Sequence, residues 1–330
     1  MRRLRKDHPA PRRGGRSVRR LRAGDERGAT AVLVALLMVP LLGFAAIAVD
    51  VGAVYAERAR LQVAADAAAL AVAQDCARGA CGDMQATANA LVTANAGEAT
   101  AAPPVLRSNP SSVTVTGSNP TRHWFAPVLG FDSTEVSATA TVAWGAPSAG
   151  TARLPLTFSW CEFAQQTGGG MPSGTTVRTI RLTKTSGTVD CTGPSRNIVP
   201  GGFGYLVTDP GECRATSAVG GRSYSSTGNT PSSDCDPADF AALVGRTVLL
   251  PIFDQFGGTG SGAWYHVYGY AAFRITGYFL GGQFGTSPRP CTGNDRCISG
   301  YFTRWVELSD DFTTSPTAPD MGAEILRLIR

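Results

Sequence analysis

The chain has 330 residues and a formal net charge of +5, and this charge is unevenly distributed. Residues 1–28 contain eleven Lys or Arg and three acidic residues, a local net charge of +8, whereas the remaining residues carry a net charge of −3. The negative net charge outside the tail excludes a general nucleic-acid binder, because neutralising phosphates requires a basic face on the folded domain. Only 17% of the residues are charged and there are 39 Gly and 21 Pro, a composition typical of turn-rich structure.

An uncharged segment of 21 residues, Ala29–Val49, follows the basic tail. As a helix it would be about 31 Å long, which matches the hydrocarbon core of a bilayer. Pro40 lies inside it, and membrane helices tolerate such a proline. The alternatives are a buried core helix and a cleaved secretory signal, whose apolar stretch is shorter, about 7–15 residues. Because the helical pattern continues past Asp50 without a break, we predict an uncleaved transmembrane helix over residues 29–49.

The charge step across this segment predicts its orientation. Basic residues stay on the cytoplasmic side, so residues 1–28 form a cytoplasmic tail and the chain from Asp50 onward is extracellular. Membrane lipid is then one partner of the chain. A cluster of arginines in the tail either touches anionic headgroups or only sets the topology. These arginines are Arg12, Arg13, Arg16, Arg19, Arg20 and Arg22.

The cysteines agree with export, since all eight lie beyond the apolar segment: Cys76, Cys81, Cys161, Cys191, Cys213, Cys235, Cys291 and Cys297. An even number in an exported chain predicts disulfides. A zinc site is the alternative, but the sequence has no Cys-x-x-Cys motif and only three histidines. Short turns separate two close pairs, Cys76–Cys81 and Cys291–Cys297. The other four allow three connectivities, and we take sequential pairing, Cys161–Cys191 and Cys213–Cys235, as a working choice.

Residues 50–97 are rich in Ala and predict a helical stalk outside the membrane. One helix is expected from near Ala29 through about Gln74, and a shorter one from Asp83 to Ala96 that stops at Gly97. A narrow stripe of small and apolar side chains repeats along the first helix. Its members are Leu61, Ala65, Ala68 and Val72. Either partner helices or the chain's own β region could cover the stripe, and helix–helix association through the stalk is one expected partnership.

Beyond Ala99 the pattern changes to strand-like alternation, which predicts an α+β fold class with a mainly antiparallel extracellular β region. Residues 98–146 predict a small membrane-proximal β region with strands at Ser112–Gly117 and Glu135–Trp144. Trp124–Gly130 is a short helix or an apolar loop, and Pro147–Thr151 is expected to be a linker. Residues 152–330 predict a Cys-rich β domain with Gly-rich breaks. Its expected strands are Leu154–Phe158, Thr176–Leu182, Tyr205–Val207, Thr247–Phe253, Tyr265–Phe279 with a break at Gly269, and Tyr301–Leu308.

No residue pattern indicates a catalytic site, a metal site or a cofactor. His123 and His266 are the only exported histidines, and each is interpreted as an ordinary packed or surface residue. No Gly-rich run continues into the Lys-Ser/Thr of a phosphate loop. The aromatic run Trp264–Tyr270 is either a stripe that binds a partner or glycan or a core strand, and we favour the core. A group of acidic residues is interpreted as solvated, with Ca²⁺ binding as the alternative; the group is Asp209, Glu212, Asp234, Asp236 and Asp239.

The first part of the chain resembles a known family. Four stretches carry the resemblance: Arg27-Gly-Ala-Thr-Ala-Val32, Pro40-Leu-Leu-Gly-Phe44, Ala48-Val-Asp-Val-Gly-Ala-Val-Tyr55 and Arg60-Leu-Gln-Val-Ala-Ala-Asp-Ala-Ala-Ala-Leu-Ala71. Together they look like the N-terminal segment of Tad/Flp pilus-assembly proteins of the TadE/TadG-like class. The family-motif positions are Gly28, Pro40, Asp50, Gly52, Tyr55, Leu61, Gln62 and Asp66. The resemblance implies a single-pass envelope protein with other Tad pilus-assembly proteins as partners, and it brings no catalytic residues and no cofactor.

Weaker similarity continues along the chain, together with two departures from related patterns. Residues 132–140 resemble the strand that closes the membrane-proximal part of such proteins, and the Cys-rich part looks like the actinobacterial variety at residues 200–204, 249–254 and 297–302. Pilins are cut after a Gly and carry a Glu five residues on. Leu33 stands five residues after Gly28, so we expect no cleavage and no role as a major fibre subunit. Neither residues 132–135 nor residues 311–314 fit the Asp-x-Ser-x-Ser set of a metal-dependent adhesion site.

Asp50 stands out because a carboxylate at the end of an apolar run is costly unless it is solvated or paired. It either lies simply at the interface, or positions the helix end or meets a partner in the pilus machinery. We therefore expect a non-enzymatic, single-pass membrane protein that assists assembly or anchoring of a Tad/Flp pilus. The alternatives are an exported adhesin or binding domain for protein or glycan, held by a signal anchor, and an exported hydrolase.

Overall fold

A computed structural model of the chain describes residues 26–183 and 189–329. The predicted basic tail, apart from its last three residues, lies outside this range. One helix, α1, runs without interruption over Glu26–Ala77. The described chain forms two compact units, one containing α1 through Ala53 together with His123–Asp132, and the other containing Val54–Arg122 and the chain from Ser133 onward.

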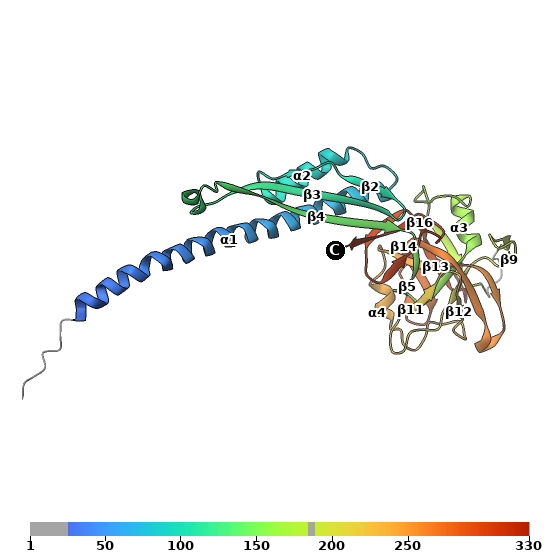
Figure 1. Cartoon of the computed structure of the whole chain (residues 1–330). Helices are drawn as coiled ribbons and strands as arrows, with labels where there is room; N and C mark the ends of the chain where they lie inside the picture. Colours follow the sequence, from blue (N-terminus) through green and yellow to red (C-terminus); the bar gives the residue numbers. More distant parts are fainter. Residues whose placement is uncertain (1–25, 184–188, 330) are drawn as a thin grey trace, which may run out of the picture. The chain divides into compact units, whose positions relative to one another are not determined.

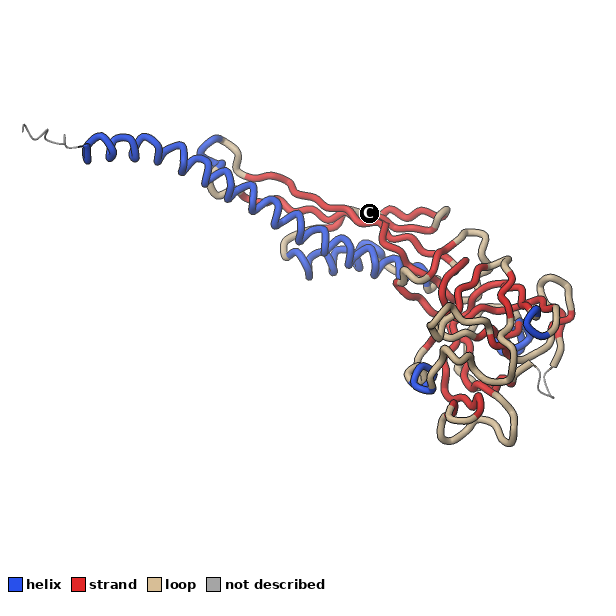
Figure 2. Tube along the Cα trace, turned by 90° about the horizontal axis from the view of Figure 1, so that it is seen from below, coloured by secondary structure: helices blue, strands red, loops and turns tan. Residues whose placement is uncertain are grey.

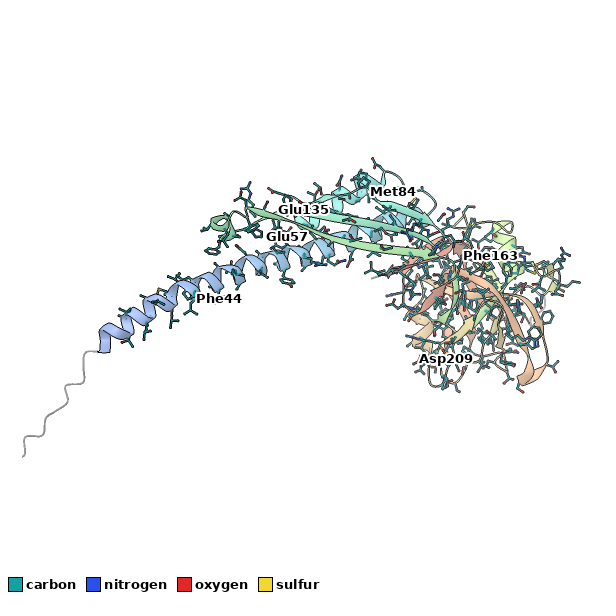
Figure 3. The ribbon with its side chains drawn as sticks, in the orientation of Figure 1. Phe44, Glu57, Met84, Glu135, Phe163 and Asp209 are labelled. Atoms are coloured by element: carbon teal, nitrogen blue, oxygen red, sulfur yellow. A yellow bond between two sulfur atoms is a disulfide. The ribbon has the colours of Figure 1, made fainter. Side chains whose placement is uncertain are left out.

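The apolar part of α1 has no protein cover in its unit. All of its large apolar side chains from Val32 to Val49 are exposed, and Phe44 points away from the helix (Figure 3). Pro40 lies inside the helix without ending it. Within the described residues, α1 is the one helix long and apolar enough to cross a membrane. Since this hydrophobic surface is as long as a bilayer core is thick, lipid is its natural cover. This part of α1 fits the transmembrane helix expected from the sequence.

In the second unit α1 becomes a half-buried helix. Its buried side chains are Leu61, Ala64, Ala65, Ala68, Ala69, Val72, Ala73 and Cys76. They pack with α2, Met84–Ala96, and with two long strands, β3, Ser111–Arg122, and β4, Ser133–Gly145; Figures 1 and 2 show these elements lying along the helix. The Asp83 side chain accepts the N–H of Ala86 at 2.9 Å and so begins α2, while Gly97, with φ 66°, ends it.

The sheet that covers α1 is built from both ends of the second unit. Its strand order is β1–β3–β4–β19–β17, with β2 paired to β3. The pair β3 and β4 is antiparallel, and β17 runs parallel to β19. Gly117 of β3 lies against both helices, since a Cβ atom there would be in ordinary van der Waals contact with Val92 at 3.4 Å and with Leu61 at 3.7 Å. The remaining strands are β1, Thr100–Ala101, β2, Val105–Ser108, β17, Trp305–Leu308, and β19, Ala323–Ile329.

The Cys-rich part of the second unit contains an eight-stranded sheet of order β10–β6–β13–β14–β16–β7, to which β12 and β15 add at β14. Its core is rich in phenylalanine, with Phe158 in ring contact with Phe203, Phe273 and Phe302. The strands are β6, Leu156–Ser159, β7, Arg178–Arg181, β10, Phe203–Tyr205, β12, Arg222–Tyr224, β13, Thr247–Gly257, β14, Trp264–Gly281, β15, Phe284–Gly285, and β16, Cys297–Thr303.

Two smaller sheets and several short helices complete the second unit. The order of one small sheet is β11–β5–β18, and the other pairs β8 with β9. These strands are β5, Pro147–Ala152, β8, Cys191–Thr192, β9, Ile198–Val199, β11, Ala215–Ala218, and β18, Phe312–Thr314. The short helices are α3, Trp160–Thr167, α4, Pro237–Ala241, and the 3₁₀ turn η2, Gly260–Gly262. A further 3₁₀ turn, η1, Ala126–Leu129, belongs to the first unit.

The structure differs from three sequence predictions about strands. Pro147–Thr151 is not a linker but most of β5, which lies between β11 and β18. The expected break at Gly269 is an irregularity and not an interruption, because β14 continues through it while its pairing with β13 shifts register between Val267 and Gly269. A Cβ atom at Gly269 would come within 2.8 Å of the Met321 sulfur, so the glycine allows close packing. The expected strand Tyr301–Leu308 is interrupted at Arg304, where β16 leaves the Cys-rich sheet and β17 joins the sheet over α1.

The last described strand also affects the predicted division of the β structure. Ile325 of β19 pairs with Gly145 of β4 in antiparallel register, so residues from the end of the chain complete the membrane-proximal sheet. One sheet therefore contains strands from both of the regions predicted at residues 98–146 and 152–330, and all of its strands lie in the second unit.

The structure has four disulfides, and each joins consecutive cysteines. They are Cys76–Cys81, Cys161–Cys191, Cys213–Cys235 and Cys291–Cys297. The first closes the turn between α1 and α2, and the second ties the start of α3 to β8. This is the sequential connectivity among the three that the sequence allowed.

Candidate functional site

Asp50, directly after the apolar run of α1, is buried, with 6% of its surface exposed. Its Oδ1 atom accepts hydrogen bonds from the backbone N–H groups of Trp124 at 2.8 Å and Phe125 at 3.3 Å. Its Oδ2 atom accepts from Phe125 at 3.1 Å and Ala126 at 2.7 Å. Three consecutive N–H groups thus converge on one carboxylate, and all of these residues belong to the first unit.

The local conformation of the chain explains this convergence. Consecutive N–H groups at the beginning of a helical turn point in one direction and form an anion-binding concavity. Here the turn is η1, which ends at Gly130 in the left-handed conformation, φ 88°. The N–H of His123 donates to the carbonyl of Asp132 at 3.0 Å and closes the segment at its base. Asp50 is therefore paired, as a carboxylate beside an apolar span requires, and it positions His123–Asp132 at the end of that span.

The segment that Asp50 holds is strongly apolar and exposed, and we call Trp124–Phe131 the apolar loop. It contains no Lys, Arg, Asp or Glu. Its exposed large side chains are Trp124, Phe125, Val128, Leu129 and Phe131. The sequence predicts a short helix or apolar loop here, but the pairing with Asp50 was not predicted, because the partners lie 74 to 76 positions apart.

Two other family-motif residues connect α1 to the sheet within the second unit. The Gln62 Nε2 atom donates to Asp66 Oδ1 at 2.8 Å and to the carbonyl of Thr139 at 3.3 Å. Because Thr139 lies in β4, this amide joins two helical positions one turn apart to the sheet. A residue outside the predicted motif adds a similar contact, since Asn119 of β3 donates to Glu57 Oε1 at 2.7 Å.

The stripe on α1 is covered by the protein itself. Leu61, Ala65, Ala68 and Val72 are all 0% exposed and pack with α2, β3 and β4. Of the two alternatives left open by the sequence, the structure therefore favours cover by the chain's own β region. Small side chains are needed there because a sheet and a second helix lie directly against it.

The remaining family-motif positions face outward. A Cβ atom at Gly28 or Gly52 would meet nothing within 4 Å, so neither glycine is required by packing inside the described chain. Tyr55 is 70% exposed, and Pro40 lies in the bare apolar part of α1. These positions are available to lipid or to another protein.

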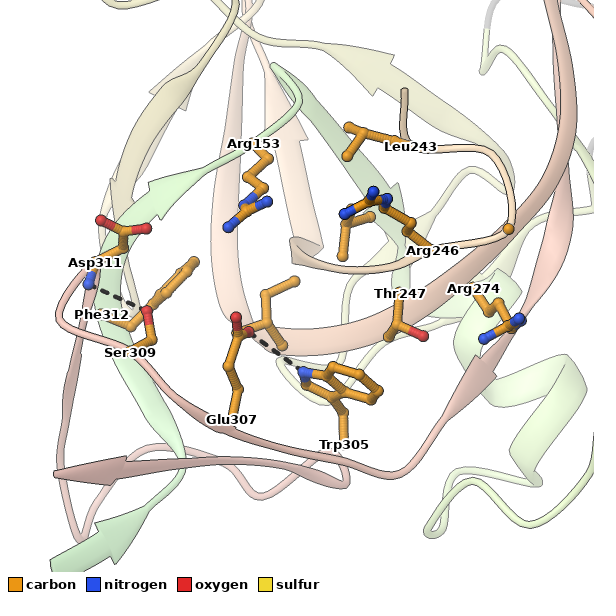
Figure 4. Close-up of a pocket in the computed structure, with 13 residues that line it drawn as sticks. Arg153, Leu243, Arg246, Thr247, Arg274, Trp305, Glu307, Ser309, Asp311 and Phe312 are labelled. Carbon is orange, nitrogen blue, oxygen red and sulfur yellow. Dashed lines mark hydrogen bonds between the residues drawn. The ribbon is translucent and has the colours of Figure 1, made fainter. Parts of the chain in front are cut away.

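A pocket of about 390 Å³ lies in the second unit, beside β13, β14 and β17 (Figure 4). Three arginines line it, Arg153, Arg246 and Arg274, together with the carboxylates Glu307 and Asp311. The Trp305 indole donates to Glu307 Oε2 at 3.3 Å. Arginines can bind a carboxylate or phosphate, but the lining of this open pocket also carries the carboxylates of Glu307 and Asp311, and we assign no ligand to it.

His266 takes part in a partly buried polar group rather than standing alone. Its Nδ1 atom lies 2.7 Å from Asp254 Oδ1, and Asp254 is fully buried. The Ser195 hydroxyl donates to the other oxygen of the same carboxylate. The carboxylate therefore lies between the serine and the histidine, whereas an activated serine needs its hydroxyl on the imidazole. This geometry supports a structural polar contact that joins β13, β14 and the turn after β8.

The acidic group considered for Ca²⁺ is engaged with its own loops. Asp209 accepts from the N–H and hydroxyl of Thr216, and Asp234 accepts from the hydroxyl of Thr208. Asp236 and Asp239 form the capping box of α4. Among the described residues, no three His, Cys, Asp or Glu side chains gather closely enough to hold a metal ion.

The aromatic run in β14 belongs to the core on one face. Tyr265, Val267 and Tyr270 are buried, in agreement with the favoured interpretation. The Tyr270 hydroxyl donates to the carbonyl of Ser217 at 2.6 Å. Burial raises the pKa of Tyr270 to about 12, so this hydroxyl keeps its proton as a structural donor.

Comparison with known protein families gives one match, which covers residues 28–75. The family is described as "Putative Flp pilus-assembly TadE/G-like". The match includes the apolar span, Asp50 and the positions Leu61, Gln62 and Asp66, so it agrees with the resemblance found in the sequence. It does not test the resemblance of the Cys-rich part to the actinobacterial variety. Neither the comparison with curated proteins nor the comparison with solved structures gave a match.

Proposed function

We propose that this chain, which is TadE/G-like over residues 28–75, is a single-pass membrane protein that assists assembly or anchoring of a Tad/Flp pilus. One observation carries the proposal: the matched segment is a single helix whose first half is bare and apolar and whose second half is the core helix of a folded unit. Such a helix suits a protein that fixes an extracellular module to the membrane where a pilus is assembled.

The orientation that we propose has the N-terminus in the cytoplasm and the Cys-rich part outside the cell membrane. The basic residues before Gly28 favour this direction. Four disulfides in the second unit support it, because disulfides persist in oxidising compartments. Epitope tags at the two ends, combined with protease treatment of intact cells, test it: only the C-terminal tag should be digested. Digestion of the N-terminal tag alone would overturn the orientation.

The role that we propose is structural rather than enzymatic. The outer end of the apolar span holds the apolar loop through Asp50, and Gly52 and Tyr55 are exposed close by in the sequence. We infer that other Tad pilus-assembly proteins meet the chain through this exposed part of the family segment. The stripe at Leu61 is excluded as that surface, because the chain's own sheet covers it.

Gene deletion followed by electron microscopy tests the proposed function. Cells lacking the chain should make few or no pili, and the full-length wild-type chain should restore them. A complementing chain without its apolar span, but exported to the same compartment through a cleavable signal, should not restore them. Normal numbers of attached pili in the deletion strain would contradict the proposal.

A further inference from the structure

The apolar loop, Trp124–Phe131, exposes a concentration of hydrophobic surface that nothing in its own unit covers. Trp124 is 78% exposed, Val128 is 90% exposed and Leu129 is 72% exposed. A cluster of large apolar side chains on the surface marks a site of interaction, whereas isolated ones do not. The loop has no charged Lys, Arg, Asp or Glu side chain that would favour water.

The position of the loop relative to the apolar span is fixed within the first unit. Four hydrogen-bond contacts of 2.7 to 3.3 Å join the Asp50 carboxylate to the N–H groups of residues 124–126. Asp50 directly follows Val49, the last residue of the uncharged run. The loop backbone therefore lies at the level where α1 leaves the hydrocarbon core.

The chemistry of the loop suits that level of a bilayer. Trp and other aromatic residues concentrate at the membrane–water interface, where the ring contacts acyl chains and the indole N–H contacts the headgroups. Backbone N–H groups are costly in such a region unless they are bonded, and the Asp50 carboxylate bonds three of them. The carboxylate is itself satisfied by the same contacts, so both partners tolerate the nearby lipid.

We propose that the apolar loop inserts into the interface of the same membrane leaflet from which α1 emerges, as a second membrane contact beside the transmembrane helix. The occupant of this surface is lipid, because Asp50 holds the loop at the end of the bare apolar span and the loop carries no charge for a polar partner. The anchor would then consist of a helix and a loop joined by Asp50. This would restrict rotation of α1 about its own axis. The proposal does not depend on a role in pilus assembly.

Fluorescence quenching in the full-length protein tests the insertion. The protein is reconstituted into phosphatidylcholine–phosphatidylglycerol vesicles with and without lipids brominated on the upper acyl chain. Subtracting the emission of Trp124→Phe from that of the wild type isolates the Trp124 signal. We expect brominated lipid to quench this difference signal about twofold or more, as for an interfacial tryptophan, and we expect aqueous iodide to leave it unchanged.

Two variants keep the result specific. Trp264→Phe is the matched control, because Trp264 lies in β14 of the second unit under the Arg222 guanidinium, and its difference signal should not respond to brominated lipid. Val128→Trp in the Trp124→Phe background moves the reporter four positions along the loop and should restore the quenching. Quenching of the Trp124 signal by iodide and not by brominated lipid would overturn the proposal. Protection from iodide that needs added pilus-assembly proteins would also overturn it, in favour of a protein partner.

Discussion

Leu61→Ala tests whether the small-residue stripe of α1 is held by the chain's own sheet. Leu61 is 0% exposed and lies against Gly117 of β3. Truncating a fully buried leucine removes its transfer free energy and leaves a cavity, at a cost of about 3 kcal/mol. Val63→Ala is the matched control, because Val63 lies two positions away on the same helix and is 61% exposed. Surface changes of that kind alter stability by about 0.5 kcal/mol or less.

Hydrogen exchange of the full-length protein in lipid nanodiscs measures this difference locally. A loss of about 3 kcal/mol should speed exchange in β3, β4 and the stalk part of α1 about a hundredfold, since about 1.4 kcal/mol is tenfold. The Val63→Ala protein should exchange like the wild type. Equal protection of the two variants would refute the reasoning, because it would mean that the stripe is not packed against the sheet.

Three further predictions concern ionisation, disulfides and the pocket. Burial raises the pKa of Glu324 to about 7, helped by the nearby Asp320 carboxylate, so the folded state binds this proton more tightly than the unfolded state and loses stability as the pH rises from about 5 to about 8. Glu324→Gln should remove a loss of stability of about 2 kcal/mol at pH 8, measured by denaturant unfolding in detergent at both pH values. An unchanged pH dependence of stability would contradict the assignment. A disulfide that closes a longer loop restricts the unfolded chain more, so removing it costs more stability. Replacing both cysteines of the Cys161–Cys191 bridge, 30 positions apart, should lower the free energy of unfolding by about 3.5 kcal/mol, against about 2 kcal/mol for Cys291–Cys297, 6 positions apart. Equal midpoint shifts in thermal unfolding would contradict this argument. Arg246→Ala should change stability by about 0.5 kcal/mol or less, because Arg246 is an exposed residue at an open pocket, and a larger loss would show that the pocket is part of the core.

The two longest helices, α1 and α2, could be predicted from the sequence because their determinants are local, whereas the short helices α3 and α4 were not predicted. The Ala-rich composition, the uncharged run and Gly97 lie within the segments whose structure they specify, and α1 and α2 end within a few residues of the predicted limits. The change in α1 from a bare helix to a half-buried one also has a local determinant, because the stripe of small and apolar side chains begins only at Leu61.

Other features depend on distant partners and could not be read in this way. Residues 147–151 have the Pro, Gly and Ser content of a linker, yet they form a strand because β11 and β18 lie on either side. Gly150 is needed there, since a Cβ atom would lie 2.4 Å from the Phe312 ring. The pairing of β19 with β4 joins residues 180 positions apart at Ile325 and Gly145, and no local pattern specifies it.

Asp50 combines both situations. Its position after an apolar run marks it as costly and therefore as paired or solvated. The identity of the partner, three N–H groups of a loop more than 70 positions away, required the structure. The apolar loop itself is visible in the sequence as an uncharged aromatic segment, but only its connection to Asp50 places it at the end of the span.

The most direct test of the account is the number of pili in the deletion strain complemented with full-length Asp50→Asn. This variant keeps the size of the side chain but removes the charge and one of the two acceptor oxygens that bind the loop. Asp75→Asn is the control, because Asp75 lies on the same helix in a half-exposed surface ion pair with Arg78. We predict normal amounts of both proteins in the membrane, few or no pili with Asp50→Asn, and normal pili with Asp75→Asn. Normal pili with Asp50→Asn would contradict the account.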